Sequence, residues 1–237
     1  MLYVYGYMRA DDAPAALGEG VESGAVSVLA EGRLVALVTA VDEVAPRRAN
    51  LLAHADVLSR ALEHGAVLPL KFGLISHEEA IRTSLATQAG ELLRKLDALD
   101  DRLEMSVSAL YREEVVLREV VEENAAVAQV RRAIVGRPAA ATHFERIRLG
   151  ELVAQAVEAK REVDGEDILR ELGPHAVAVA SDAPLHERMV VNAAFLVDRD
   201  RLDEFDAAVE AVSRARAERM QFKLLGPRPP HSFVEAT

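Results

Sequence analysis

The clearest structural signal in the sequence runs over residues 25–41, which read AVSVLAEGRLVALVTAV. Two apolar stretches rich in β-branched side chains, residues 25–30 and 34–41, flank the polar break Glu31-Gly32-Arg33. Glycine adopts the left-handed backbone angles that a tight turn needs, so the pattern predicts a β-hairpin.

The elements around this hairpin complete a unit with the order β-α-β-β-α-β. Residues 2–7 carry aromatic and β-branched side chains that predict a strand, and residues 11–20 predict a short helix. After the hairpin, apolar side chains at helical spacing predict a helix over residues 49–64, and residues 67–72 predict a short closing strand. Residues 1–75 are therefore expected to form an N-terminal α+β module.

The same order of elements is predicted a second time, after a helical linker over residues 76–100. Its elements are a strand over 103–111, a helix over 142–172 that begins at the capping box of Thr142 and Glu145, strands over 176–180 and 189–197, a helix over 201–217 and a strand over 220–225. Further helices are predicted over residues 113–134. Residues 101–237 are thus expected to form a C-terminal ferredoxin-like module with inserted helices and a proline-rich tail.

The predicted fold class is therefore α+β, with two tandem ferredoxin-like modules joined by a helical linker. Each module is expected to be an antiparallel sheet with helices packed on one face, and the second module is enlarged by the inserted helices. The repeat lies in the order of the elements and not in residue identity.

The composition excludes several classes of partner and site. The chain has 39 acidic and 28 basic side chains, and its net charge of -11 repels nucleic acid and anionic membrane surfaces. It has no cysteine, which excludes disulfides and thiolate metal sites and favours a reducing cytoplasm. The sequence has no pattern of a secretory signal, and its apolar runs are far shorter than the ~20 residues that cross a bilayer. We expect a cytoplasmic protein without nucleic-acid or membrane partners.

No arrangement of residues predicts catalysis, a metal site or a bound cofactor. The sequence His77-Glu78-Glu79 begins like a zinc-binding helix motif, but Ile81 stands where the second histidine would be needed. Adjacent acidic residues on a helix point in different directions and cannot flank one reacting bond, so acidic pairs are expected to form a solvated face. We expect no catalytic, cofactor-binding or metal-binding residues.

One polar residue interrupts an apolar strand. Asn192 lies between Val191 and Ala193 in the predicted strand 189–197, and a buried amide must be hydrogen-bonded. A structural hydrogen bond is the favoured interpretation, and a ligand-binding role is the alternative.

Four segments carry a resemblance to a known family. They are YVYG over residues 3–6, VLPLKFG over 67–73, VNAAFLV over 191–197 and GPRPPHSF over 226–233. In this order, and in a chain of this size, they resemble the gas vesicle protein F and L family along nearly the whole sequence. Two positions depart from that pattern, because Arg228 stands where an aromatic residue is common and His231 where tyrosine is common. Whether the chain resembles the F type or the L type more is left open.

The resemblance implies an accessory protein of gas vesicle assembly that is not an enzyme and needs no cofactor. It implies binding to the small hydrophobic shell protein and to other gas vesicle accessory proteins, and a location in the cytoplasm and at the gas vesicle. A shell that stays dry inside must be built from subunits with a large apolar face, and such a face aggregates in water unless another protein covers it.

Two segments are candidate partner-binding or structural motifs, together with Asn192. The first contains Pro69, Lys71, Phe72 and Gly73, where Phe72 either stands exposed for a partner or fills the core. The second is the tail with Gly226, Pro227, Pro229, Pro230 and Phe233, whose prolines favour an extended conformation. The tail is expected to dock either on a partner or, by slight preference, back on the first module.

Two other functions fit the pattern of elements. One is a small-ligand-binding or haem-binding α+β barrel protein or enzyme, in which His143 or His186 could serve as an axial ligand. The other is a regulatory domain that binds a metabolite and dimerises.

Overall fold

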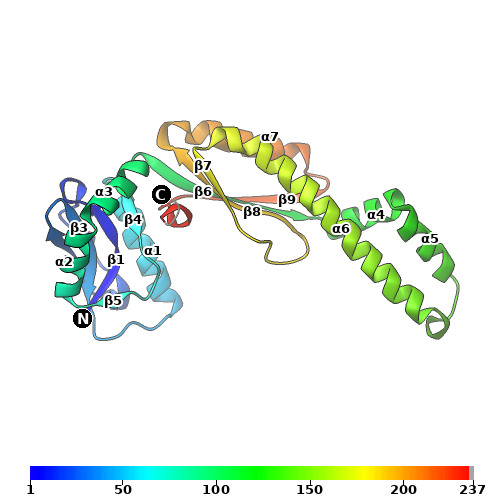
Figure 1. Ribbon diagram of the computed structural model, residues 1–237, viewed down its shortest axis with the longest axis horizontal. Coiled ribbons are helices and arrows are strands. Elements are labelled where there is room, and N and C mark those ends of the chain that lie inside the picture. The colour runs from blue at the N-terminus through cyan, green and yellow to red at the C-terminus, as the bar shows by residue number, and fades with distance from the viewer. Residues whose placement is uncertain (235–237) are drawn as a thin grey trace. The chain divides into compact units, whose positions relative to one another are not determined.

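The computed structural model describes residues 1–234 and contains two antiparallel β-sheets with helices (Figure 1). The chain divides into two compact units. The first unit consists of residues 1–105, 196–200 and the tail from Gly226, and the second of residues 106–195 and 201–225. The fold class is α+β, as predicted. The boundaries expected at residues 75 and 100 stay a prediction.

The first sheet has the strand order β2-β3-β1-β4, with β5 paired to β1. Its strands are β1 (Leu2–Arg9), β2 (Val26–Glu31), β3 (Leu34–Ala40), β4 (Val67–Pro69) and β5 (Ile75–Ser76). The β2-β3 hairpin is formed as predicted, with Glu31 opposite Leu34 and Gly32 at a φ of +60°. This strand order is that of a ferredoxin-like sheet, in which the first and third strands lie in the centre.

Helices cover both faces of the first sheet, whereas the sequence suggested one face. Helix α1 (Arg48–Leu62) packs on the face that carries Tyr3 and Tyr5, because the His54 ring of α1 lies 5.7 and 5.6 Å from their rings. Helices α2 (Glu78–Thr87) and α3 (Ala89–Ala98) contact β1, β2, β3 and β4. On this side Arg9 of β1 pairs with Asp97 at 2.6 Å. The unbroken apolar run of β3 is typical of a strand that is buried on both faces.

The short helix expected over residues 11–20 is absent, and that prediction is wrong. The chain forms two 3-10 turns instead, Ala10–Asp12 and Val21–Ser23. Residue 20 must be a glycine, because a Cβ atom there would lie 2.0 Å from the Tyr5 hydroxyl oxygen. Gly18, with a φ of +70°, is equally unsuited to a helix.

The second sheet repeats the strand order of the first, as β7-β8-β6-β9. Its strands are β6 (Arg102–Tyr111), β7 (Ala178–Ser181), β8 (Met189–Asp198) and β9 (Met220–Arg228). Helices α6 (His143–Leu172) and α7 (Leu202–Ala215) contact each other along it (Figure 1). Phe195 of β8 packs on Phe205 of α7 with ring centroids 5.2 Å apart. The predicted second βαββαβ unit is therefore present.

Two inserted helices pack against the N-terminal half of α6. They are α4 (Glu113–Glu123) and α5 (Ala125–Ile134), and their buried side chains include Val116, Val120 and Val127. Asn124 separates them, because its side-chain oxygen accepts hydrogen bonds from the backbone N–H groups of two residues at the start of α5. We call α4, α5 and residues 143–161 of α6 the helical arm.

Over the described residues 1–234, none of the helices combines the length and the apolar character that crossing a bilayer requires.

Candidate partner-binding surfaces

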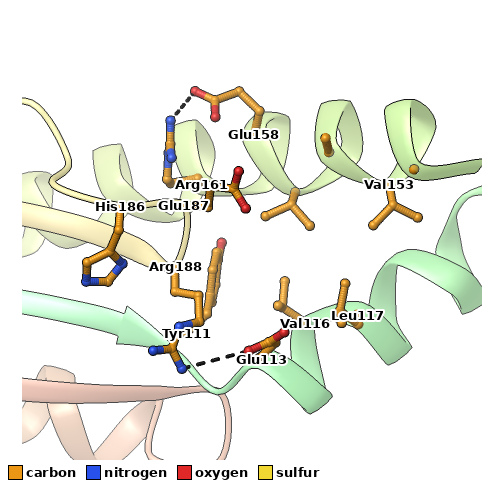
Figure 2. Close-up of a pocket in the computed structure, with 13 residues that line it drawn as sticks. Tyr111, Glu113, Val116, Leu117, Val153, Glu158, Arg161, His186, Glu187 and Arg188 are labelled. Atoms are coloured by element: carbon orange, nitrogen blue, oxygen red, sulfur yellow. Dashed lines mark hydrogen bonds and ion pairs between the residues drawn. The ribbon is translucent and has the colours of Figure 1, made fainter. Parts of the chain in front are cut away.

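A groove of about 590 Å³ lies between α4 and α6 in the helical arm (Figure 2). Its walls are apolar and come from both helices: Val116, Leu117, Val153, Ala154 and Val157, with Gly150 beside them. Leu117 and Ala154 are exposed to solvent, so the groove is open. Helical spacing explains it, because residues 153, 154 and 157 lie on one face of α6.

The polar rim of this groove contains charges that are paired with each other. Arg161 pairs with Glu158 on α6, and Arg188 approaches Glu113 at 3.9 Å (Figure 2). His186 and Glu187 complete the rim from the loop between β7 and β8. The rim therefore offers little net charge to a ligand, and the apolar walls are the dominant feature of the groove.

A network of hydrogen bonds, which includes Tyr111 of the groove, joins α4 and α6 to the second sheet. Tyr111 at the end of β6 donates to Asp164 of α6 at 2.5 Å. Arg219, which precedes β9, donates to Asp164 at 2.9 Å and to both carboxylate oxygens of Glu119 at 2.7 and 2.9 Å. Lys160 reaches Glu119 at 3.1 Å.

The charges in this network stabilise each other. The hydrogen bond from Arg219 lowers the pKa of Glu119, and hydrogen bonds to Glu119 and Asp164 raise the pKa of Arg219. Burial, with the hydrogen bond to Asp164, raises the pKa of Tyr111 well above its usual value. These groups are fixed in their charge states at neutral pH and serve to hold the arm.

The C-terminal tail docks on the first unit of its own chain. Its anchor is Glu104 of β6, whose side chain is fully buried and accepts hydrogen bonds from Arg228 at 2.6 Å and from the Ser232 backbone N–H at 2.7 Å. Phe233, Pro229 and Pro230 are buried. The tail thus packs on its own chain at Glu104, which lies within the residues 101–237 expected for the second module, and docking on the predicted first module stays a prediction.

Gly226 permits the tail to turn at its start. The residue has a φ of +142°, and a Cβ atom there would lie 2.6 Å from the Met105 Sδ atom and 2.8 Å from the Glu104 carbonyl oxygen. A side chain would meet both, so only glycine fits. Pro227, which follows, is exposed.

The segment with Pro69, Lys71, Phe72 and Gly73 lies at the edge of the first sheet. Pro69 is buried in the edge strand β4 and faces Gly6 of β1. Phe72 is half-buried, with its ring 5.7 Å from Tyr3 and 5.8 Å from His54, so it is part of the core and also reaches solvent. Lys71 and Gly73 are exposed.

Buried hydrogen bonds fix this segment to α1. The Gly73 N–H donates to the Tyr3 hydroxyl at 3.3 Å, and that hydroxyl donates to His54 Nδ1 at 2.8 Å. His54 Nε2 donates in turn to the Leu70 carbonyl oxygen at 3.2 Å. Burial lowers the pKa of His54 to about 4, so the imidazole is neutral at pH 7. Nothing in the sequence marked His54 as more than a residue of the predicted helix.

Asn192 belongs to the second unit, whereas the tail and the 69–73 segment belong to the first. It is half-buried in β8, and its backbone carbonyl accepts from the Asp182 N–H at 2.8 Å. It lies beside a hollow of about 280 Å³ that α6 also lines. His143 and His186 are exposed, and within residues 1–234 no group of three or more histidine or acidic side chains could hold a metal ion.

The sequence model of the family described as "Gas vesicle synthesis protein GvpL/GvpF" matches residues 1–235. The chain belongs to the GvpL/GvpF family. Proteins of both types are similar to it. Gas vesicle protein F of Streptomyces sp. (strain CB03234) is 36% identical over 98% of this chain and 99% of that protein. Gas vesicle protein L of the same strain is 30% identical over 98% and 92%.

Solved structures of the GvpL/GvpF family have the same fold. The crystal structure of GvpF from Anabaena sp. PCC7120 matches with a TM-score of 0.84 and 24% identity, over 98% of this chain and 97% of that one. The crystal structure of GvpF from Microcystis aeruginosa matches with a TM-score of 0.81 and 24% identity over 98% of both chains. The family membership places this protein in gas vesicle assembly.

Proposed function

We propose that this protein is an accessory protein of gas vesicle assembly that binds the hydrophobic shell protein and delivers it, and that it acts by binding and not by catalysis. The observation that carries the proposal is the open groove between α4 and α6, whose walls are apolar and four of whose five rim charges are in ion pairs. A groove of this kind can bind the apolar face of a helix, or a row of apolar side chains, from another protein. Membership in the GvpL/GvpF family indicates that this binding serves gas vesicle assembly.

The pairing of most polar groups at the groove supports binding rather than catalysis. Catalysis needs an ionisable group that is free to exchange a proton with substrate. Glu113, Glu158 and Arg161 at the rim of the groove are in ion pairs, and Tyr111 is committed to Asp164. The net charge of -11 would keep a complex with an apolar subunit in solution.

The test is binding of the purified shell protein to variants of the groove. Val157→Glu places a carboxylate among the apolar walls and should weaken binding about tenfold or more, since this charge must lose its water in the complex. Ala154→Glu makes the same change at an exposed position of the groove, where folding is not at risk. Affinity is measured by surface plasmon resonance on the immobilised full chain, with thermal melting as the check on folding.

Val163→Glu is the matched control. Val163 is an exposed valine of the same helix, 60% accessible, and it does not line the groove. Its substitution should leave the affinity unchanged. Equal affinities for the parent chain and both groove variants would contradict the proposal.

The remaining surfaces that the sequence suggested are part of the same proposal. The half-buried Phe72, the exposed Lys71 and Gly73, and Asn192 are proposed to contact other accessory proteins or to support the surfaces that do. Substituting Phe72 by leucine would retain its packing against Tyr3 and remove its aromatic face. Loss of binding to an accessory protein, with an unchanged melting temperature, would support a contact role.

A further inference from the structure

A second hollow, of about 440 Å³, lies at the corner of the helical arm where α4, α5 and α6 meet. Its apolar residues are Leu117, Val121, Ile134, Val135, Leu149 and Val153. Its polar residues are Arg131, Arg137 and Arg146, and no acidic side chain of the described chain lines it. We call it the arginine-rich corner.

The charge of this region is opposite to that of the chain. Residues 125–150 contain five arginines and one glutamate, a net charge of +4, in a protein whose net charge is -11. All five arginines are exposed. Within residues 1–234 the one ion pair that they make joins Arg137 to Glu145 at 3.8 Å. The corner therefore has positive charge that its own chain leaves largely unneutralised.

The same stretch of sequence has large apolar side chains that are open to solvent, and one of them, Val135, lines the hollow. Phe144 is 80% exposed, Val135 69% and Ile147 48%. Val135 would lose contact with water when a partner covers the hollow, whereas Phe144 and Ile147 do not line it.

We propose that the arginine-rich corner is the docking site of an amphipathic helix from a partner protein, with an apolar stripe flanked by acidic residues. The stripe would lie in the hollow against Leu117, Ile134 and Leu149, and the acidic flanks would meet Arg131, Arg137 and Arg146. Guanidinium groups bind carboxylates with two parallel hydrogen bonds, which fixes the helix in one register. The helix-in-groove mode has this combination of apolar anchors and charged edges.

A partner helix fits better than an anionic membrane or a nucleic acid. Membrane-bound surfaces insert a convex apolar face between lipid headgroups, whereas this apolar surface is hollowed. Nucleic acid needs a polar, positively charged track, and here the arginines surround an apolar floor. The inference does not rest on shell-protein binding, which is proposed for the neighbouring groove and has its own variants.

The test uses a fluorescent synthetic peptide of about 18 residues, or about five helical turns, with leucines at helical spacing and glutamates on both flanks. Its binding to the full chain is measured by fluorescence anisotropy at low and high salt. We expect saturable binding that weakens with salt, and an affinity about tenfold lower for the same peptide with lysine in place of each glutamate.

A charge exchange identifies the site. The double variant Arg131→Glu and Arg146→Glu should lose about tenfold affinity for the acidic peptide and gain affinity for the lysine peptide. The matched control is Arg170→Glu with Arg214→Glu, which changes the same charge at two arginines that are 71% and 74% exposed on α6 and α7. The control should bind the acidic peptide like the parent chain, and circular dichroism verifies that all variants are folded.

Three outcomes would overturn the inference. The first is equal affinity for the acidic and lysine peptides, and the second is equal loss of binding in the corner variant and the control variant. The third is tight binding to phosphatidylglycerol vesicles that the corner variant abolishes while the acidic peptide does not compete, which would assign the corner to a membrane surface.

Discussion

At the scale of a single residue, His54 makes stability depend on pH. An ordinary histidine has a pKa of about 6.5 and His54 in the folded protein about 4, so between these values the unfolded chain takes up a proton that the folded chain does not. The contribution of the neutral His54 to the free energy of unfolding is fully present above pH 6.5. It falls by about 1.4 kcal/mol per pH unit as the pH decreases from 6.5 towards 4. We expect a loss of about 2 kcal/mol between pH 6.5 and 5 in denaturant titrations.

The His54→Gln variant removes this titration, so its free energy of unfolding should depend less on pH. At pH 7 the variant should be less stable than the parent chain. The control is His64→Gln, because His64 is exposed and lies two residues beyond the end of α1. This control should keep the slope of the parent chain. An unchanged slope in His54→Gln would disprove the role of this residue.

Single residues were the hardest features to predict from the sequence. Gly20 and Gly226 are required by the close approach of remote segments, Tyr5 in one case and Glu104 and Met105 in the other. The sequence contains the glycines but not the approach of those segments. His54 likewise becomes special only when Tyr3 and Leu70, both distant in sequence, close around it.

At the scale of elements, Arg219 should control the attachment of α4 to α6 and the second sheet. Replacing Arg219 by methionine keeps much of its apolar stem but leaves Glu119 and Asp164 without their shared cation. Because these groups are partly exposed, we expect a loss of about 1–2 kcal/mol in the free energy of unfolding. Hydrogen exchange should accelerate in α4 more than in α7.

The matched substitution is Arg214→Met. Arg214 pairs with Glu210 one turn away on α7, and both side chains are at least 70% exposed. Its loss should cost only a few tenths of a kcal/mol, as for other exposed pairs on one helix. If both variants lose the same stability, the Arg219 network does not hold the arm.

The elements themselves followed from the sequence where the pattern was local. The β2-β3 hairpin, α1 and the strands of the second unit were predicted from spacing and turn residues. The helix predicted over residues 11–20 is absent because Gly20 lies close to the Tyr5 hydroxyl and Gly18 has a positive φ. The groove between α4 and α6 and the Arg219 network were missed, since residues 119 and 219 are 100 positions apart and no local pattern joins them.

At the scale of the whole molecule, the tail completes the same unit that β1 and the rest of the first sheet belong to. The tail supplies Arg228 and Ser232 to Glu104, whose side chain has no exposure to water. The sequence indicated that the tail could dock on its own chain, but it contained no sign that Glu104 was the acceptor. An acidic residue between two apolar residues of a predicted strand, as Glu104 is between Leu103 and Met105, is ordinarily assigned to the solvent face.

Removing the tail from Gly226 onward should therefore lower the melting temperature of the isolated protein. The truncation leaves a buried carboxylate without Arg228, which costs about 3 kcal/mol or more when water cannot replace the partner. Glu104→Gln separates this electrostatic cost from lost packing. In the full chain this substitution should lower the melting temperature, because the amide replaces a charged partner of Arg228. In the truncated chain it should raise the melting temperature, because burying a neutral amide costs less than burying a carboxylate. Thermal melting of the four proteins forms a double-mutant cycle, and an additive result would show that Glu104 does not anchor the tail.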